Sequence, residues 1–286
     1  GGTLGQMIPP SGALIVFGII AEQSIGRLFT AAIIPGLTQA LSYVAVIWLL
    51  VRFRPSLAPR SERASWRERL QALGRVADML LLIAFVIGGI ALGWMSPSEA
   101  AAFGAASALA LAAWRGRISR AMLFTAFEET LRTSGLILLV IIGALIFSVF
   151  VSVTGLADGL GAAVANSGWG TIPTLLLIAV LLLALGSVLD GLALMLLTTP
   201  ILLPIVTELG MSPIWFGIFI CRAMEIGFVH PPLGMNLFVI QGVAKDVPIS
   251  RIFKGVMPFL ASDLVHLVCL ILFPAMALWL PQWLGQ

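Results

Sequence analysis

Two Pro-Pro pairs near opposite ends of the chain are the residues whose chemistry stands out first. Pro9-Pro10 lies in the segment GQMIPPSG, residues 5–12, and Pro231-Pro232 lies in GFVHPPLG, residues 227–234. Because proline lacks a backbone N–H and clashes with the preceding turn, two in succession leave helix carbonyls unpaired. At membrane depth those carbonyls need a cation, a ligand or protein cover. A helix break that occurs twice in this way is typical of a transporter's binding site.

Oxygen atoms surround the first break. Gly1, Gly2 and Gly5 permit close approach of the backbone to a ligand, and Thr3 and Ser11 add hydroxyl oxygens. A set of hard oxygen ligands of this kind suits Na⁺. A simple kinked helix is the alternative, since Gly and Pro are frequent in membrane helices. The matching second copy favours the ion site.

Ionisable residues precede the second break. Arg222 and Glu225 are three residues apart, so on a helix they share one face and can neutralise each other. Ionisable side chains within a membrane are costly and are candidates for function, but we interpret these two as a structural ion pair. Beyond the break, Asn236 either orients a substrate or caps the helix that restarts there, and the cap is the simpler role.

A polar tip lies between two further apolar runs. Asp190 follows one run, and Thr198-Thr199-Pro200 and Pro204 are expected to break the next, which predicts a helical hairpin. Asp190 is interpreted as an ion ligand, a proton site or, most simply, the cap of the second arm, with Thr198 as another substrate-facing candidate. In the last span Asp263 and His266 also share a face, which predicts a structural pair rather than a proton relay.

Composition defines the setting of these residues. The 286-residue chain is 60% hydrophobic and 10% charged, with a mean hydropathy of +1.09, which indicates a polytopic membrane protein. Two histidines without a Ser-His-Asp arrangement or a zinc motif give no support to an enzyme. Its two cysteines lack metal-binding spacing, and a Walker A motif for ATP is absent from the sequence.

Apolar runs predict the helices that position the polar residues. Runs compatible with a bilayer span of roughly 20 residues occupy 36–53, 77–95, 98–114, 135–153, 171–189 and 258–280. Shorter runs beside the two breaks and at 191–205 predict half-helices or re-entrant hairpins. Amphipathic segments at 24–34, 119–134 and 248–257 predict helices in the membrane interface.

Charge predicts the orientation. The net charge is +3, and the segment 52–75 holds seven arginines against two glutamates, so it is expected on the cytoplasmic side. The segment 115–120 is also basic, whereas the turn at 96–99 carries no positive charge. Membrane topology explains these arginines without a nucleic-acid partner.

The similarity between the two breaks continues downstream. Small shifts align Ile25, Arg27, Phe29 and Pro35 with Ile249, Arg251, Phe253 and Pro258, which predicts an inverted repeat. Because eight residues precede the first Pro-Pro pair, we expect that roughly 100 or more residues of the first copy are missing from this sequence. The chain is therefore interpreted as a C-terminal fragment whose first repeat is truncated at its N-terminus.

These motifs in combination resemble the large membrane subunit of tripartite ATP-independent periplasmic (TRAP) transporters, of the dicarboxylate-type branch. The resemblance is carried by GGTLGQMIPPS at 1–11, EQSIGRLF at 22–29, TPILLP at 199–204, PPLGMNLF at 231–238 and GVMPF at 255–259. It implies an all-α polytopic membrane protein, an inverted-repeat elevator-type transporter with re-entrant hairpins and broken helices.

Four parts follow from this interpretation. Residues 1–23 are the broken helix that ends the first-repeat transport element, and 24–134 are scaffold spans with the cytoplasmic Arg-rich segment. Residues 135–247 are the second-repeat transport element with hairpins and a broken helix. Residues 248–286 are an interface helix and the terminal scaffold span.

The resemblance also implies a function. It predicts sodium-coupled symport of a small organic acid, such as a C4-dicarboxylate, into the cell across the bacterial inner membrane. The expected partners are a periplasmic substrate-binding protein and a small membrane subunit, with Na⁺ as coupling ion and no other cofactor. An ion or solute channel, a passive assembly subunit and a nonfunctional truncated fragment are the alternatives.

Sodium ligands are also implied by the resemblance. Carbonyls of Gly5, Ile8 and Pro10 are expected to bind one ion, and those of Gly227, His230 and Pro232 a second. Family members usually carry threonine at the position of His230, which puts one ligand of the second site in doubt. An imidazole beside the ion path would also make transport sensitive to pH.

Overall fold

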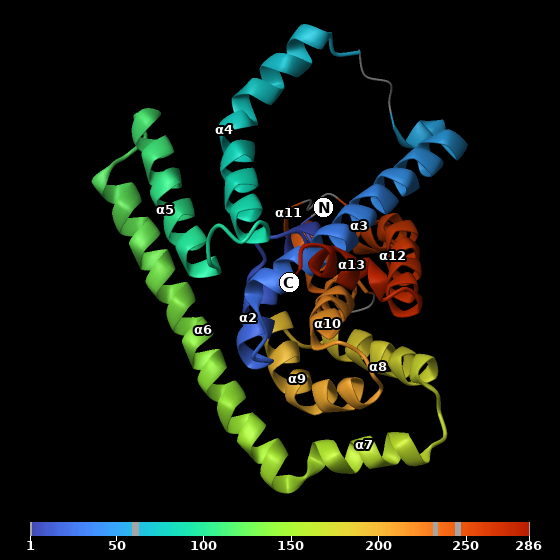
Figure 1. Ribbon diagram of the computed structural model, residues 1–286. Coiled ribbons are helices and arrows are strands. Elements are labelled where there is room, and N and C mark those ends of the chain that lie inside the picture. Colours follow the sequence, from blue (N-terminus) through green and yellow to red (C-terminus); the bar gives the residue numbers. More distant parts are fainter. Residues whose placement is uncertain (1, 59–62, 231–233, 244–246, 286) are drawn as a thin grey trace. The chain divides into compact units, whose positions relative to one another are not determined.

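The computed structural model describes residues 2–58, 63–230, 234–243 and 247–285 (Figure 1). These described residues form helices joined by turns, in agreement with the expected all-α class. Pro231 and Pro232 lie outside them, so the second Pro-Pro pair is known here only from its flanking residues.

Five helices among the described residues are long and apolar enough to cross a membrane. They are α3 (Ile25–Phe53), α4 (Trp66–Ala91), α6 (Arg120–Thr154), α9 (Gly191–Glu208) and α12 (Ile249–Leu272). The remaining elements include α5 (Pro97–Trp114), α7 (Leu156–Asn166), α8 (Thr171–Gly186) and the short 3₁₀ helix η1 (Pro55–Leu57). Multiple apolar helices of this length characterise a multi-span membrane protein.

Two predictions about helix ends are wrong. The apolar run expected at 258–280 is divided, because α12 ends at Leu272 and α13 (Ala275–Trp283) begins after Pro274. Proline cannot donate the hydrogen bond that would continue α12. Conversely, Pro200 and Pro204 lie inside α9 and do not break it. Each proline removes one backbone hydrogen bond of α9, and the helix stays continuous because its buried face packs against the protein.

The expected interface helices are not separate elements. Residues 24–34, 119–134 and 248–257 join the spans that follow them within α3, α6 and α12. In α3, Leu28, Phe29 and Ala32 are buried in the protein interior instead of facing a membrane surface. The apolar side of this segment therefore packs against the rest of the protein.

The chain divides into two compact units. One comprises residues up to Val46 together with Ile137 onward, and the other runs from Ile47 to Leu136. The first unit contains residues 24–46 and 248–286, which were expected to belong to the scaffold. It also contains the elements around both breaks. The division into mobile and fixed parts stays a prediction.

Helix α10 (Pro213–Gly227) is the centre of the first unit. All its residues from Ile214 onward are buried, and it contacts α8, α9, α12 and the N-terminal helices. Trp215 stacks on Phe219 with ring centroids 5.0 Å apart, and its indole Nε1 donates to the carbonyl of Leu270 at 3.0 Å. A helix that is buried on every side in this way packs against neighbouring helices all around its axis.

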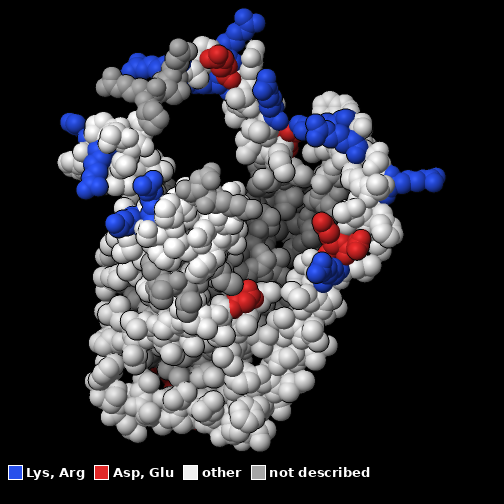
Figure 2. Space-filling model, turned by 180° about the vertical axis from the view of Figure 1, so that it is seen from behind, with Lys and Arg blue, Asp and Glu red and all other residues white. Residues whose placement is uncertain are grey.

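The second unit contains the helical hairpin of α4 and α5. Each helix begins with a capping box, in which Ser65 pairs with Glu68 and Ser96 with Glu99. Many large apolar side chains of both helices are exposed, and uncharged residues make up most of the face shown in Figure 2. Such a surface is compatible with contact to lipid.

Candidate functional site

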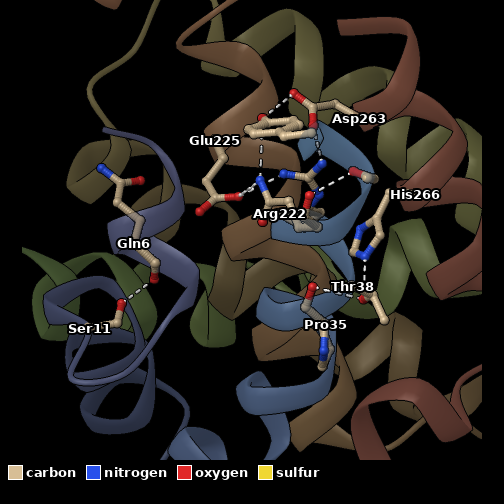
Figure 3. A network of polar contacts seen from close by, with 11 residues as sticks. Gln6, Ser11, Pro35, Thr38, Arg222, Glu225, Asp263 and His266 are labelled. Carbon is tan, nitrogen blue, oxygen red and sulfur yellow. Dashed lines mark hydrogen bonds and ion pairs between the residues drawn. The ribbon is translucent and has the colours of Figure 1, made fainter. Parts of the chain in front are cut away.

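The first Pro-Pro pair interrupts a helix, as expected. Helix α1 (Leu4–Met7) ends before Ile8, whose backbone is extended, and α2 (Gly12–Ile20) starts after Ser11. The Ser11 hydroxyl accepts from the Leu14 N–H at 3.3 Å and donates to the carbonyl of Gln6 (Figure 3). Ser11 therefore joins the two half-helices and is 1% exposed.

The described residues around the second pair also show two separate helices. Helix α10 ends at Gly227, and α11 (Met235–Val243) begins after Gly234. The Gly227 carbonyl accepts from the His230 N–H at 3.3 Å. Asn236 lies in the first turn of α11, not at its cap position, and its N–H donates to the Phe228 carbonyl at 3.1 Å.

The end of α10 approaches the end of α8 backbone to backbone. A Cβ added at Gly227 would lie 2.7 Å from the carbonyl carbon of Gly186 and 2.9 Å from its Cα. A Cβ at Gly191 would lie 2.3 Å from Sδ of Met224. The tip between α8 and α9, residues 187–190, is thus held against the helix that leads into the second break.

The structure shows the cap role for Asp190. Its carboxylate accepts from the Leu192 N–H at 3.1 Å and starts α9. Helices α8 and α9 flank a polar tip, as expected, but the second arm is continuous through Pro200 and Pro204. The Thr198 hydroxyl is buried and donates within α9 to the Leu194 carbonyl at 2.7 Å.

Two buried polar atoms near these elements were missed by the sequence analysis. Gln6 Oε1 and Thr199 Oγ1 have no hydrogen-bond partner in the described part of the chain. Gln6 belongs to the first broken helix, where Thr3 is also buried, and Thr199 follows Thr198 in α9. A buried polar atom without a partner is a ligand candidate, because its desolvation is otherwise uncompensated. In the sequence, only the polar side chains of Gln6 and Thr199 within apolar segments could have indicated such a role.

A buried ionic cluster lies beside the breaks, in the first compact unit. Arg222 Nη1 lies 2.8 Å from Glu225 Oε2, which confirms the ion pair expected from their spacing. Arg222 Nη2 lies 2.5 Å from Asp263 Oδ1 on α12. All three side chains are at most 3% exposed, and Figure 3 shows the guanidinium between the two carboxylates.

Helix α3 completes the cluster. The Tyr43 hydroxyl donates to Asp263 Oδ2 at 2.8 Å, and the Gln39 amide donates to Glu225 Oε2 at 3.2 Å. The cluster therefore joins α3, α10 and α12. Two carboxylates against one guanidinium give it a formal charge of −1. Such a group is stable in a membrane protein only where hydrogen bonds and protein cover compensate for lost hydration.

The expected pair of Asp263 and His266 is wrong. Asp263 pairs with Arg222 and Tyr43, while His266 Nε2 lies 2.9 Å from the Thr38 hydroxyl. Thr38 already donates to the Ile34 carbonyl at 2.9 Å, so the imidazole is the donor to it. Both residues share a face of α12, but α10 and α3 supply nearer partners.

Comparison with known proteins agrees with this architecture. Residues 1–276 match the family "Tripartite ATP-independent periplasmic transporter, DctM component". The whole chain is 33% identical to the C4-dicarboxylate TRAP transporter large permease protein DctM of Pseudomonas aeruginosa, of which it covers 66%. It is 34% identical to the protein of that name from Rhodobacter capsulatus, covering all of this chain and 68% of the relative.

A third relative has a different printed substrate. It is the sialic acid TRAP transporter large permease protein SiaM of Vibrio cholerae, with 31% identity over 98% of this chain and 65% of the relative. The chain thus spans about two thirds of the length of each of these three relatives. From the family match and these identities, the chain belongs to the DctM family of TRAP transporter permeases, a family of membrane transporters and not of enzymes.

Proposed function

We propose that this protein imports a small organic acid across the bacterial inner membrane, driven by Na⁺. It works with a periplasmic substrate-binding protein and a small membrane subunit, which the tripartite family description supports. The observation that carries the proposal is the break between α1 and α2, with a second helix interruption after α10. Broken helices of this kind offer carbonyls to cations and helix N-termini to anions.

The first sodium ion is proposed at the carbonyls of Gly5, Ile8 and Pro10. Ile8 is outside the helical conformation, which supports its carbonyl as a ligand. The second ion is proposed at Gly227 and His230, with Pro232 outside the described residues. A carbonyl has two lone pairs, so the Gly227 oxygen can bind an ion while it accepts from His230. The pH dependence suggested for His230 stays a prediction.

The substrate is proposed to carry a carboxylate. The N-terminus of α2 directs the positive end of its dipole toward the first break, which suits an anion. Of the predicted substrate-facing residues, Thr3, Asp190 and Asn236 remain candidates, while the hydroxyls of Ser11 and Thr198 already donate to carbonyls. Gln6 and Thr199 join the proposal, since each has a buried polar atom without a partner among described residues.

An elevator movement is part of the proposal. The buried cluster binds α10 to α3 and α12, so any movement of the second break carries those parts of α3 and α12 with it. We therefore propose that these parts of α3 and α12 belong to the mobile element, although residues 24–134 and 248–286 were expected as scaffold. The cytoplasmic position of residues 52–75 is likewise proposed from their arginines.

Uptake into proteoliposomes tests the function. The full-length protein, its small subunit and its binding protein would be reconstituted and supplied with radiolabelled C4-dicarboxylate or sialic acid. We expect saturable uptake that requires an inward Na⁺ gradient and the binding protein. Uptake that is unaffected by replacing Na⁺ with choline would refute the sodium coupling. Non-saturable flux would support a channel.

A matched pair of threonines tests the site. Thr199→Val removes a buried hydroxyl that has no hydrogen-bond partner among the described residues, and we expect a raised half-saturating concentration of Na⁺ or substrate. Thr207→Val is the control on the same helix, because the Thr207 hydroxyl is exposed and donates to the Leu203 carbonyl at 2.7 Å. If both variants have the same half-saturating concentrations of Na⁺ and substrate, Thr199 is not part of the site.

A further inference from the structure

A groove lies between α4 and α5, within the second compact unit and separate from the site described above. Its volume is about 420 Å³, within the range of roughly 300–1,000 Å³ that small-molecule pockets occupy. The walls are apolar and carry no aromatic side chain: Val76, Met79, Leu82, Ala108, Leu111 and Ala112. The short side chains of Ala108 and Ala112 leave a space on the α5 side.

Charged residues border the groove. Arg75, Arg115 and Arg117 line it together with a single acidic residue, Asp78. Arg115 forms a salt bridge with Asp78 and is half exposed. It also donates to the Arg75 carbonyl at 3.5 Å. Three arginines against one aspartate leave an excess of two positive charges beside an apolar groove.

Chain topology places this charge at the membrane boundary. The helices α4 and α5 run antiparallel around the turn at 92–96, so Arg115 at the end of α5 returns to the level of Asp78 on α4 (Figure 1). The apolar part of α4 begins just after Arg75. Arg115 and Arg117 therefore follow the C-terminal end of α5, beside Arg75 and Asp78 of α4.

We propose that this groove binds an anionic phospholipid, with an acyl chain along the apolar walls and the phosphate at Arg75 and Arg117. Basic sites between membrane helices on the cytoplasmic side suit anionic headgroups. Arginine presents a planar set of donors that matches phosphate oxygens. The aliphatic walls suit an acyl chain.

Lipid binding to the purified full chain in detergent tests the proposal. Native mass spectrometry would compare phosphatidylglycerol with phosphatidylcholine of the same acyl chains. We expect preferential retention of phosphatidylglycerol, and no comparable binding of inorganic phosphate, which lacks the acyl chain. Arg75→Gln and Arg117→Gln should each weaken binding about five-fold, since one arginine near the surface contributes about 1 kcal/mol. Arg67→Gln, on α4 but outside the groove, is the charge-matched control.

Two further variants separate the charge from the groove. Ala112→Phe fills the groove without a change in charge and should abolish the preference, whereas Ala113→Phe, exposed and outside the lining, should not. Asp78→Asn removes the acidic partner of Arg115 and should strengthen binding several-fold.

Three results would overturn the proposal. One is equal retention of the two lipids by the unaltered protein. Another is equal binding by the Ala112→Phe and Ala113→Phe variants. The third combines two observations: the unaltered protein shows no lipid preference, and the Ala112→Phe variant no longer binds a co-expressed small membrane subunit. That result would assign the groove to a protein partner.

Discussion

Arg222 holds two carboxylates from two helices in a site closed to solvent. Its guanidinium contacts Glu225 at 2.8 Å and Asp263 at 2.5 Å, and all three groups are buried. A buried ion pair contributes little net stability compared with apolar residues, but removal of one partner leaves an uncompensated charge. The stability of the first compact unit therefore depends strongly on this one side chain.

We predict that Arg222→Met lowers the free energy of unfolding by about 3–5 kcal/mol, because two carboxylates lose their cation. Thermal unfolding of the purified protein in detergent measures the change. Arg27→Met, at an exposed arginine, is the control and should stay within about 0.5 kcal/mol of the unaltered protein. Combining Arg222→Met with Glu225→Gln and Asp263→Asn should recover part of the loss. Equal transitions for the Arg222 and Arg27 variants would contradict the role of the cluster.

At the scale of elements, glycines determine how closely the ends of α8 and α10 pack. Gly227 has backbone atoms of Gly186 within 3 Å of where a Cβ would stand, and backbone cannot rotate away as a side chain can. Gly186, on the other side of the contact, has more room for a Cβ atom. A Cβ at Gly186 would meet Leu194 Cδ2 at 3.4 Å and Gly227 Cα at 3.5 Å, which are ordinary contacts.

We predict unequal effects for two small substitutions in this contact. Gly227→Ala should destabilise the protein by about 1–3 kcal/mol, as overpacking does elsewhere, and should impair transport by displacing the hairpin tip. Gly186→Ala should be close to neutral. Thermal unfolding and proteoliposome uptake measure both. If the two variants are indistinguishable, the backbone contact between α8 and α10 does not exist in the membrane.

At the scale of the whole molecule, the arginines of the chain predict its orientation in the membrane. The segment 52–75 carries an excess of positive charge, and the turn before α5 carries none. The positive-inside rule therefore predicts that these two regions lie on opposite sides of the membrane.

A pair of exposed serines tests this orientation. We predict that Ser56→Cys reacts with an impermeant thiol reagent in inside-out vesicles, and Ser98→Cys in right-side-out vesicles. The background would carry alanine at Cys221 and Cys269, the two native cysteines. Labelling of both positions from the same side would show that the hairpin of α4 and α5 does not cross the membrane as proposed.

The amino-acid sequence by itself determined the all-helical membrane class, the apolar spans in α3, α4 and α6, the break at Pro9-Pro10 and the pair of Arg222 with Glu225. These depend on local composition, proline chemistry and helix periodicity, which act over a few neighbouring residues. The Asp190 cap belongs to the same group, because a cap bonds within its own first turn.

Only the tertiary structure decided whether a single proline interrupts a helix. Pro35, Pro200 and Pro258 lie inside helices, although each removes the same donor as Pro9. The difference arises from packing around the helix, which local sequence does not contain. In the same way Asp263 joined Arg222 instead of His266, because its partner lies 41 positions away in the chain. Contacts between distant segments depend on how the helices pack against one another, and this packing is a property of the folded chain.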